Sequence, residues 1–139
     1  MARMIFINLP SSDLGRTEAF YRALGWNKNP AFSDNTAICM VWSETIYAML
    51  LTHDKWRTFT DRTIPDAHKS CQVLCALNLD DRDTVDRLAL AAPEAGGTSD
   101  PNPLQDHGFM YSRSVADPDG HIWEFFWMDP AAIPPQSQS

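Results

Sequence analysis

One carboxylate stands inside an apolar stretch near the end of the chain. An acidic turn, Asp117 to Gly120, leads into the run His121 to Met128, whose only carboxylate is Glu124. Burying an unpaired charge costs several kcal/mol or more, so Glu124 must be paired, protonated, metal-bound or open to a wet cavity. Glu124 is therefore a candidate catalytic acid or base, and a structural carboxylate held by an arginine or by backbone donors is the alternative.

Two histidines lie near this carboxylate in the sequence. His107 sits in a polar loop beside an aspartate that could orient it, so we expect either a catalytic partner in proton transfer or a solvated side chain. We expect His121 to begin the strand and to hydrogen-bond the turn before it. Strand alternation puts His121 and Glu124 on opposite faces, so they are not expected to share a ligand.

Aromatic and basic residues complete the set of candidates for ligand binding. Tyr111 and Arg113 share one face of the preceding strand, and Arg113 could pair with Glu124 or with an anionic group of a substrate. Trp56 stands in a polar segment that offers it no packing pattern, which indicates a lid or an interface anchor. The other four tryptophans are assigned to core and dimer packing, with an aromatic cage for a cation as the alternative.

The whole chain has the size of one domain. Its 139 residues are 44% hydrophobic, which predicts a single domain over residues 1–129 and a disordered tail over 130–139. The net charge of −7 argues against nucleic acid and anionic membrane as partners and favours a cationic ligand. The apolar run Met4 to Ile7 is too short for a signal peptide or a membrane span, and the three cysteines are typical of a reducing compartment. We therefore expect a soluble, cytoplasmic protein.

The candidate residues are positioned by an α+β fold. We predict strands over residues 5–9, 36–41 and 45–51, and a helix from Leu14 to Leu24 that Gly25 ends. After a polar linker over 53–70 we predict a strand over 71–79, a helix through Val85 to Ala92, and a hairpin of 109–115 with 121–128.

The two halves of the chain repeat each other. Asn8-Leu9 falls on Asn78-Leu79 at an offset of seventy residues, and each pair leads into an acidic helix start. We infer an internal duplication with modules over 3–52 and 71–128, whose apolar sheet faces curl around a shared cavity.

These motifs resemble the vicinal oxygen chelate superfamily, which includes glyoxalase I, extradiol dioxygenases and bleomycin resistance proteins. The resemblance covers roughly residues 4–129, through Asn8-Leu9-Pro10, the helix end Phe20 to Gly25, and the segment Asp117 to Glu124. It implies two βαβββ modules that form an open cupped sheet around a cavity, and a homodimer.

The resemblance also implies four metal ligands in the metal-dependent members. Glu124 matches the last ligand, whereas the other three positions fall near Phe6, near Ala48 or Met49, and near Leu74. None of those side chains binds a hard or borderline cation, so the usual metal site is not expected. The cofactor stays open, because a divalent metal would need ligands from other positions.

Three functions agree with these observations. The first is a lyase or dioxygenase-type enzyme with a degenerate metal site, in which Glu124 and His107 are catalytic. The second is a binding protein of the bleomycin-resistance kind that sequesters a drug or metabolite without turnover. The third is a structural dimer whose cavity is filled by side chains. For the first two we expect a small-molecule pocket formed by Phe6, Asn8, Met49, Trp56, Leu74, Tyr111 and Arg113.

Overall fold

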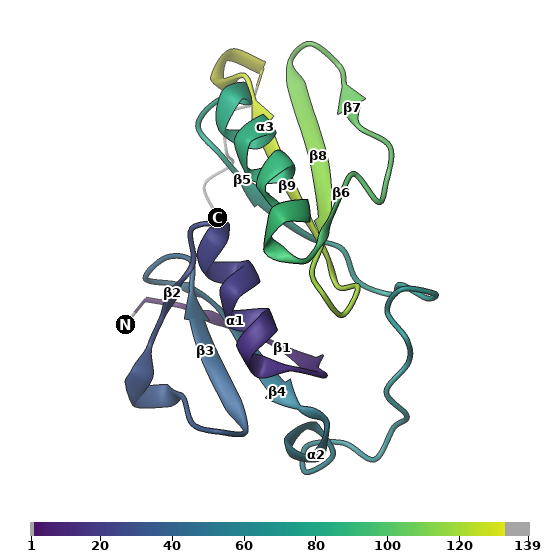
Figure 1. The fold of residues 1–139 in the computed structure, drawn as a ribbon. Coiled ribbons are helices and arrows are strands. Elements are labelled where there is room, and N and C mark those ends of the chain that lie inside the picture. Colours follow the sequence, from purple (N-terminus) through teal and green to yellow (C-terminus); the bar gives the residue numbers. More distant parts are fainter. Residues whose placement is uncertain (1, 133–139) are drawn as a thin grey trace.

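The first half of the chain forms a βαβββ module. The structure is a computed structural model that describes residues 2–132 (Figure 1). The first module comprises β1 (Ile5–Ser11), α1 (Leu14–Ala23), β2 (Asn27–Lys28), a 3-10 turn (Pro30–Phe32), β3 (Ala37–Val41) and β4 (Ile46–Thr52). Its sheet has the order β1-β4-β3-β2, and β1 pairs with β4 in parallel. The predicted strands and the predicted helix of this half are confirmed.

The second half repeats this arrangement. It comprises β5 (Cys75–Asn78), α3 (Arg82–Ala91), a 3-10 turn (Pro93–Ala95), β6 (Thr98–Ser99), β7 (Gln105–Asp106), β8 (Met110–Ala116) and β9 (Ile122–Met128). Its sheet has the order β5-β9-β8-β6, with β7 paired to β8, and β5 pairs with β9 in parallel. A last 3-10 turn covers Pro130–Ala132, and the rest of the predicted tail lies outside the described residues.

Local sequence explains where the two long helices begin and end. The side chains of Asp13 and Asp81 cap the helices by accepting hydrogen bonds from the backbone N–H groups of Arg16 and Thr84. Gly25, just after α1, has a φ of +99°, a conformation in which glycine alone is unstrained. Each module thus begins its long helix with a capping aspartate.

The two modules share one hydrophobic core. The largest buried side chains come from both modules, and Trp26, Trp42 and Trp123 form a cluster of aromatic rings at their boundary. In the second sheet Trp123 and Phe125 face this core, so the alternating residues Glu124 and Phe126 lie on the opposite face. We call the sheet faces turned away from the shared core the open face.

Hydrogen bonds between residues far apart in the sequence join the two modules, and those of Tyr21 are buried. The Tyr21 hydroxyl donates to Asp117 Oδ2 at 2.8 Å and accepts from Trp123 Nε1 at 2.9 Å. His121 Nε2 lies 2.8 Å from the carbonyl oxygen of Pro10 on β1. Ser12 donates both its N–H and its hydroxyl to Asp119. The acidic turn of the second module is therefore fixed against the first module.

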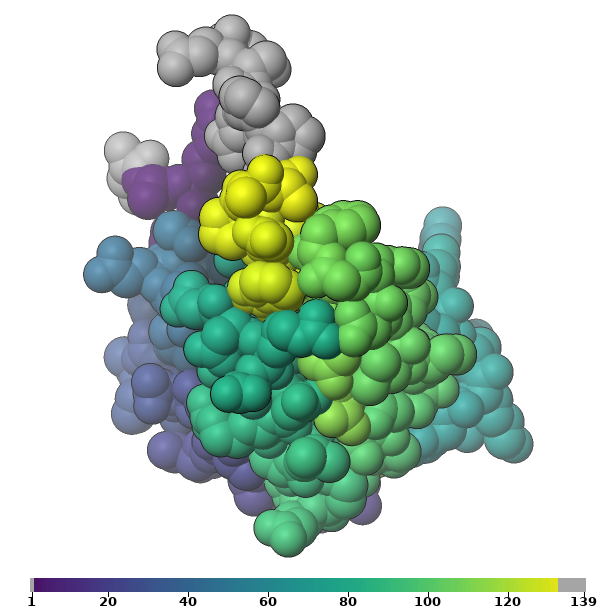
Figure 2. All heavy atoms as spheres, turned by 90° about the horizontal axis from the view of Figure 1, so that it is seen from above, coloured from purple at the N-terminus to yellow at the C-terminus, as the bar shows by residue number. Residues whose placement is uncertain are grey.

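The linker between the modules departs from the sequence prediction at both ends. Residues His53–Trp56 form the short helix α2 within the predicted linker, and the chain from 71 to 74 is not a strand. The remaining linker runs outward and returns to β5, and it projects to the right in Figures 1 and 2. It touches the body at Gly120, where an added Cβ would lie 2.6 Å from the backbone nitrogen of His68.

Candidate functional site

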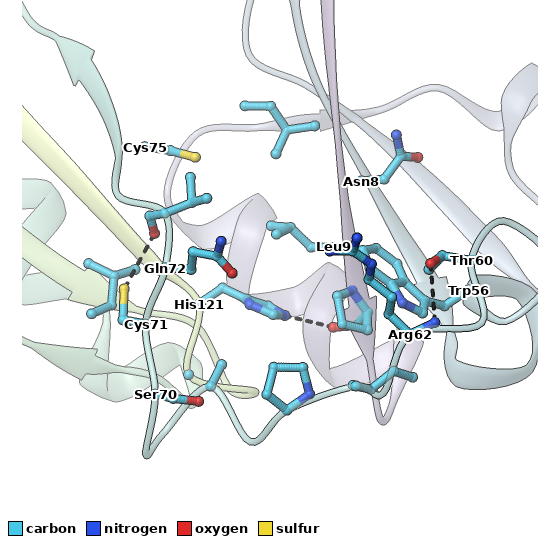
Figure 3. A pocket seen from close by; sticks show the side chains of 18 of the residues that line it. Asn8, Leu9, Trp56, Thr60, Arg62, Ser70, Cys71, Gln72, Cys75 and His121 are labelled. Atoms are coloured by element: carbon cyan, nitrogen blue, oxygen red, sulfur yellow. Dashed lines mark hydrogen bonds between the residues drawn. The ribbon is translucent and has the colours of Figure 1, made fainter.

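A cavity of about 460 Å³ lies between the linker and the two modules (Figure 3). We call it the linker cavity. β1 supplies Ile7 to Pro10, the beginnings of β5 and β9 supply Cys75 and Ile122, and the linker covers the remaining side. The volume falls within the range of about 300–1,000 Å³ that is usual for small-molecule sites.

The walls of the linker cavity are mostly apolar. Leu9 and Pro10 line it from β1, Ile64 and Val73 line it from the linker, and Trp56 of α2 adds an indole ring. Trp56 is half-buried there, so its ring is available to a ligand. The sequence offers Trp56 no packing pattern, and in the structure the residue forms part of a cavity wall.

Several polar side chains line the same cavity. Among them are Asn8, Arg62, Gln72 and His121, of which Asn8 is a predicted binding residue. The Pro10 carbonyl can only accept, so His121 Nε2 carries the proton in the 2.8 Å contact. Nδ1 of neutral His121 is then an acceptor. The backbone N–H of His121 donates to Asp117 Oδ1, which confirms the predicted hydrogen bond between His121 and the turn.

Two thiols, Cys71 and Cys75, also line the linker cavity. Cys71 is exposed, and its Sγ donates weakly to the carbonyl of Val73 at 3.4 Å. Burial raises the pKa of the Cys75 thiol, and the nearby Cys71 adds to the effect. Because the thiolate is the reactive form, Cys75 is a poor nucleophile at neutral pH.

Glu124 does not line the linker cavity. It lies on the open face of β9, half-buried, with Ala76 and Ser114 opposite it on the neighbouring strands. Within residues 2–132 no hydrogen bond or ion pair to its carboxylate is formed. Its part in chemistry therefore stays a prediction.

Tyr111 and Arg113 lie on the core side of β8, so the suggested pairing of Arg113 with Glu124 is wrong. Arg113 stands opposite Phe125 in the β8 and β9 register, and its guanidinium binds Asp100 at 2.6 Å and Asp86 at 3.0 Å. The Tyr111 hydroxyl donates to Asp86 at 2.5 Å. The hydroxyl and the guanidinium lower the pKa of Asp86, which keeps this cluster ionised.

The remaining predicted site residues are spread over the surface. His107 is exposed in its loop, 3.2 Å from Gln105 Oε1, and it does not line the linker cavity. Phe6 is 46% exposed and stacks on Tyr47, and Leu74 is 50% exposed, so neither fills a cavity in the single chain. Asn8 is the predicted binding residue that the structure brings together with Trp56.

The residues at the expected ligand positions do not fit a divalent metal. Asn8 and Met49 are paired on β1 and β4, and Phe6 pairs with Tyr47, so no carboxylate or imidazole comes from the first sheet at this level. Within residues 2–132 no three His, Cys, Asp or Glu side chains lie close enough to hold a metal ion. Glu124 alone offers the hard donor that such a site needs.

His121, Arg62 and Gln72 were not predicted as site residues. The contact of His121 with Pro10 spans 111 residues of sequence, and periodicity within one element carries no signal of it. Arg62 belongs to the predicted linker, which has no hydrophobic periodicity, and Gln72 falls in the predicted strand over 71–79, whose pattern indicated no site. The nearest sequence signal was Trp56 itself, a large aromatic residue at the start of that polar segment.

The comparisons with known proteins agree with this architecture. The family described as bleomycin resistance protein-like N-terminal matches residues 3–42. No curated protein matches the chain. Within residues 2–132, every helix is too short or too polar to cross a bilayer.

Solved structures resemble the chain over most of its length. A hypothetical protein from S. aureus has a TM-score of 0.75 at 23% identity, over 91% of this chain and 94% of that one. A glyoxalase/bleomycin resistance protein/dioxygenase family enzyme from Burkholderia phytofirmans PsJN has a TM-score of 0.73 at 16% identity, over 91% and 99%. An antibiotic binding protein from Streptomyces sp. CB03234 has a TM-score of 0.63 at 16% identity, over 92% and 97%. The chain therefore has the vicinal oxygen chelate fold, which confirms the resemblance seen in its sequence.

Proposed function

We propose that this protein binds a small molecule in the linker cavity and sequesters it without chemical change. The carrying observation is the cavity itself, which has apolar walls, one half-buried indole and a few convergent polar groups. Sites of this composition hold ligands by burying apolar surface, while a few polar contacts fix the orientation.

The chemistry of the cavity supports binding over turnover. Its histidine already donates to a backbone carbonyl, burial disfavours the thiolate of Cys75, and Glu124 lies elsewhere. A general acid or base must lie within hydrogen-bond distance of the reacting proton. The described residues of the cavity wall include no carboxylate, and His121 is their one imidazole. The cavity therefore lacks a pair of groups that could act as acid and base together. The similarity of residues 3–42 to bleomycin resistance proteins and the antibiotic binding neighbour agree with sequestration.

We further propose a cytoplasmic homodimer that covers the open face. Large apolar side chains are exposed at Ile5 and Phe6 on the edge strand β1, and at Val73 and Leu74 in the segment just before β5. A second copy of the chain would remove this surface from water, and apolar patches of this kind commonly mark interfaces. Sedimentation at micromolar concentration tests the assembly, and a monomer at all concentrations would contradict it.

The binding proposal is tested by titration with an aromatic ligand library. Ligands are expected to quench tryptophan fluorescence in the wild type, and Trp56→Phe should remove most of the quenching. Trp127→Phe is the matched control, because Trp127 is equally half-buried and does not line the cavity. Recovered ligand should be chemically unchanged, and dialysis against a chelator should leave binding intact. Trp123 also lines the cavity and accounts for any residual quenching, so quenching in Trp56→Phe as strong as in the wild type, or conversion of the ligand, would reject the proposal.

An enzyme that uses Glu124 is the second candidate. The observation in its favour is that Glu124 is half-buried without a cationic partner in the described part of the chain. In the proposed dimer this carboxylate would face the partner and could act as a general acid or base. Turnover of any ligand that binds, abolished by Glu124→Gln with unchanged affinity, would establish this function in place of sequestration.

A further inference from the structure

The linker cavity has a charge opposite to that of the protein. The chain carries 18 acidic and 11 basic residues. Among residues 2–132, however, no Asp or Glu lines this cavity, whereas the positively charged Arg62 does. The net charge of the protein favoured a cationic ligand, but the charged group that lines the cavity favours an anionic ligand.

Arg62 is available to a ligand. Its guanidinium is exposed, and within the described residues no carboxylate oxygen lies within the 4.0 Å limit of an ion pair. Its sequence neighbour Asp61 does not line the cavity. By contrast Arg57, on the adjoining turn, is already paired with Asp54 at 3.3 Å. Arg62 can therefore present its planar donors to a carboxylate or sulfonate in a two-point contact.

Two acidic side chains face a different cavity. A second cavity shares Ile64, Pro65 and Ala67 with the linker cavity and includes Asp66 and Asp119. Asp119 accepts hydrogen bonds from Ser12, and Asp66 Oδ1 accepts from the N–H of His68. Neither carboxylate lines the linker cavity, so a ligand bound there would contact Arg62 and not these two groups.

We propose that the linker cavity selects flat aromatic molecules that carry one negative charge. The ring would lie against Trp56 and the apolar side chains of β1, while the anionic group would contact Arg62. This inference rests on the proposed binding function and adds the chemical class of the ligand. The anionic group is identified only by its charge and by its two or more acceptor oxygens, so an aryl carboxylate serves as the probe.

Three naphthalene probes of equal ring size test the preference. Calorimetric titration at low salt compares 2-naphthoate, neutral 2-naphthamide and cationic 2-naphthylmethylammonium. Exposed ion pairs contribute up to about 1 kcal/mol, so naphthoate should bind up to about fivefold more tightly than the amide, and the cation should bind most weakly. Arg62→Gln should equalise acid and amide, as should about 0.5 M salt. Arg57→Gln, the matched control, should keep the preference.

The possible outcomes separate the ligand class from the binding function. If all three probes bind equally, or the cation binds most tightly, the charge preference is rejected while the binding function stands. An anion preference that survives Arg62→Gln rejects the role of Arg62 and with it this inference. If none of the probes binds, both the preference and the proposed function are rejected for ligands of this size.

Discussion

Replacing Tyr21 by Phe removes one hydroxyl that serves both modules. The side chains of Tyr21, Asp117 and Trp123 are 1%, 1% and 2% exposed, so water cannot replace the lost bonds. The change leaves the Trp123 N–H without its acceptor and Asp117 Oδ2 without its donor. An unsatisfied buried group costs about 1–3 kcal/mol, and more when it is charged. We expect Tyr21→Phe to lower the free energy of unfolding by about 3 kcal/mol at pH 7.

The loss should depend on pH because Asp117 is a buried carboxyl. Burial raises the pKa of Asp117, while the charge of His121 and the Tyr21 hydroxyl oppose that rise. A raised carboxyl pKa in the folded state favours folding below the unfolded value of about 3.9, and this contribution is lost as pH rises through the folded pKa. Without the Tyr21 hydroxyl the pKa of Asp117 in the folded state rises further. The pH range over which stability falls therefore extends to higher pH in the variant than in the wild type. We expect a smaller loss of about 1.5 kcal/mol at pH 4, because a raised pKa increases the protonated fraction of Asp117 as pH falls, and an unpaired neutral group costs less than an unpaired charge.

Urea denaturation followed by circular dichroism measures both values, at a fixed protein concentration because association would add to stability. Tyr47→Phe is the control, since its hydroxyl bonds the Glu44 carbonyl at an exposed position and should cost less than about 0.5 kcal/mol. The reasoning is refuted if Tyr21→Phe is as mild as the control, or if its loss is the same at pH 4 and pH 7.

Three further substitutions test other parts of the structure. Gly120→Ala should cost about 3 kcal/mol in thermal unfolding, because φ is +97° and the linker backbone leaves no space, whereas Gly108→Ala, with φ +78° and open space, should cost about 1 kcal/mol. Arg113→Gln should cost about 2 kcal/mol in urea, because its side chain is 12% exposed and joins two aspartates, while the more exposed Arg82→Gln should cost less than about 1 kcal/mol. Glu124→Gln should change stability by less than about 0.5 kcal/mol, and a larger change would reveal a partner for this carboxylate.

Local sequence signals were sufficient for the long elements. The caps Asp13 and Asp81 and the periodic apolar residues after them placed both helices, and the acidic turn placed the hairpin of β8 and β9. The predicted strand over 71–79 was too long for a physical reason. Its partner β9 begins at Ile122, and in the register of the two strands residues 71–73 lie opposite positions before that start, so they have no strand to pair with, whatever their own pattern.

Long-range register decided what the sequence could not. The hairpin pairs Arg113 with Phe125 and Ser114 with Glu124, and residues directly opposite share a face. The alternation within each strand does not show whether Arg113 and Glu124 lie on the same face, because a shift of one residue in the register exchanges the two faces. The linker cavity was unpredictable in the same way, since it depends on where residues 57–74 rest on two distant modules.

The bonds between Tyr21, Asp117 and Trp123 have a consequence for the order of events during synthesis. They connect positions 96 and 102 residues apart, so the polar groups around Tyr21 find their partners only after the acidic turn has left the ribosome. Until then the nascent N-terminal half holds an incomplete core with exposed indole and phenol surface. Such distant closure slows folding, and it prolongs the time during which this apolar surface is open to aggregation.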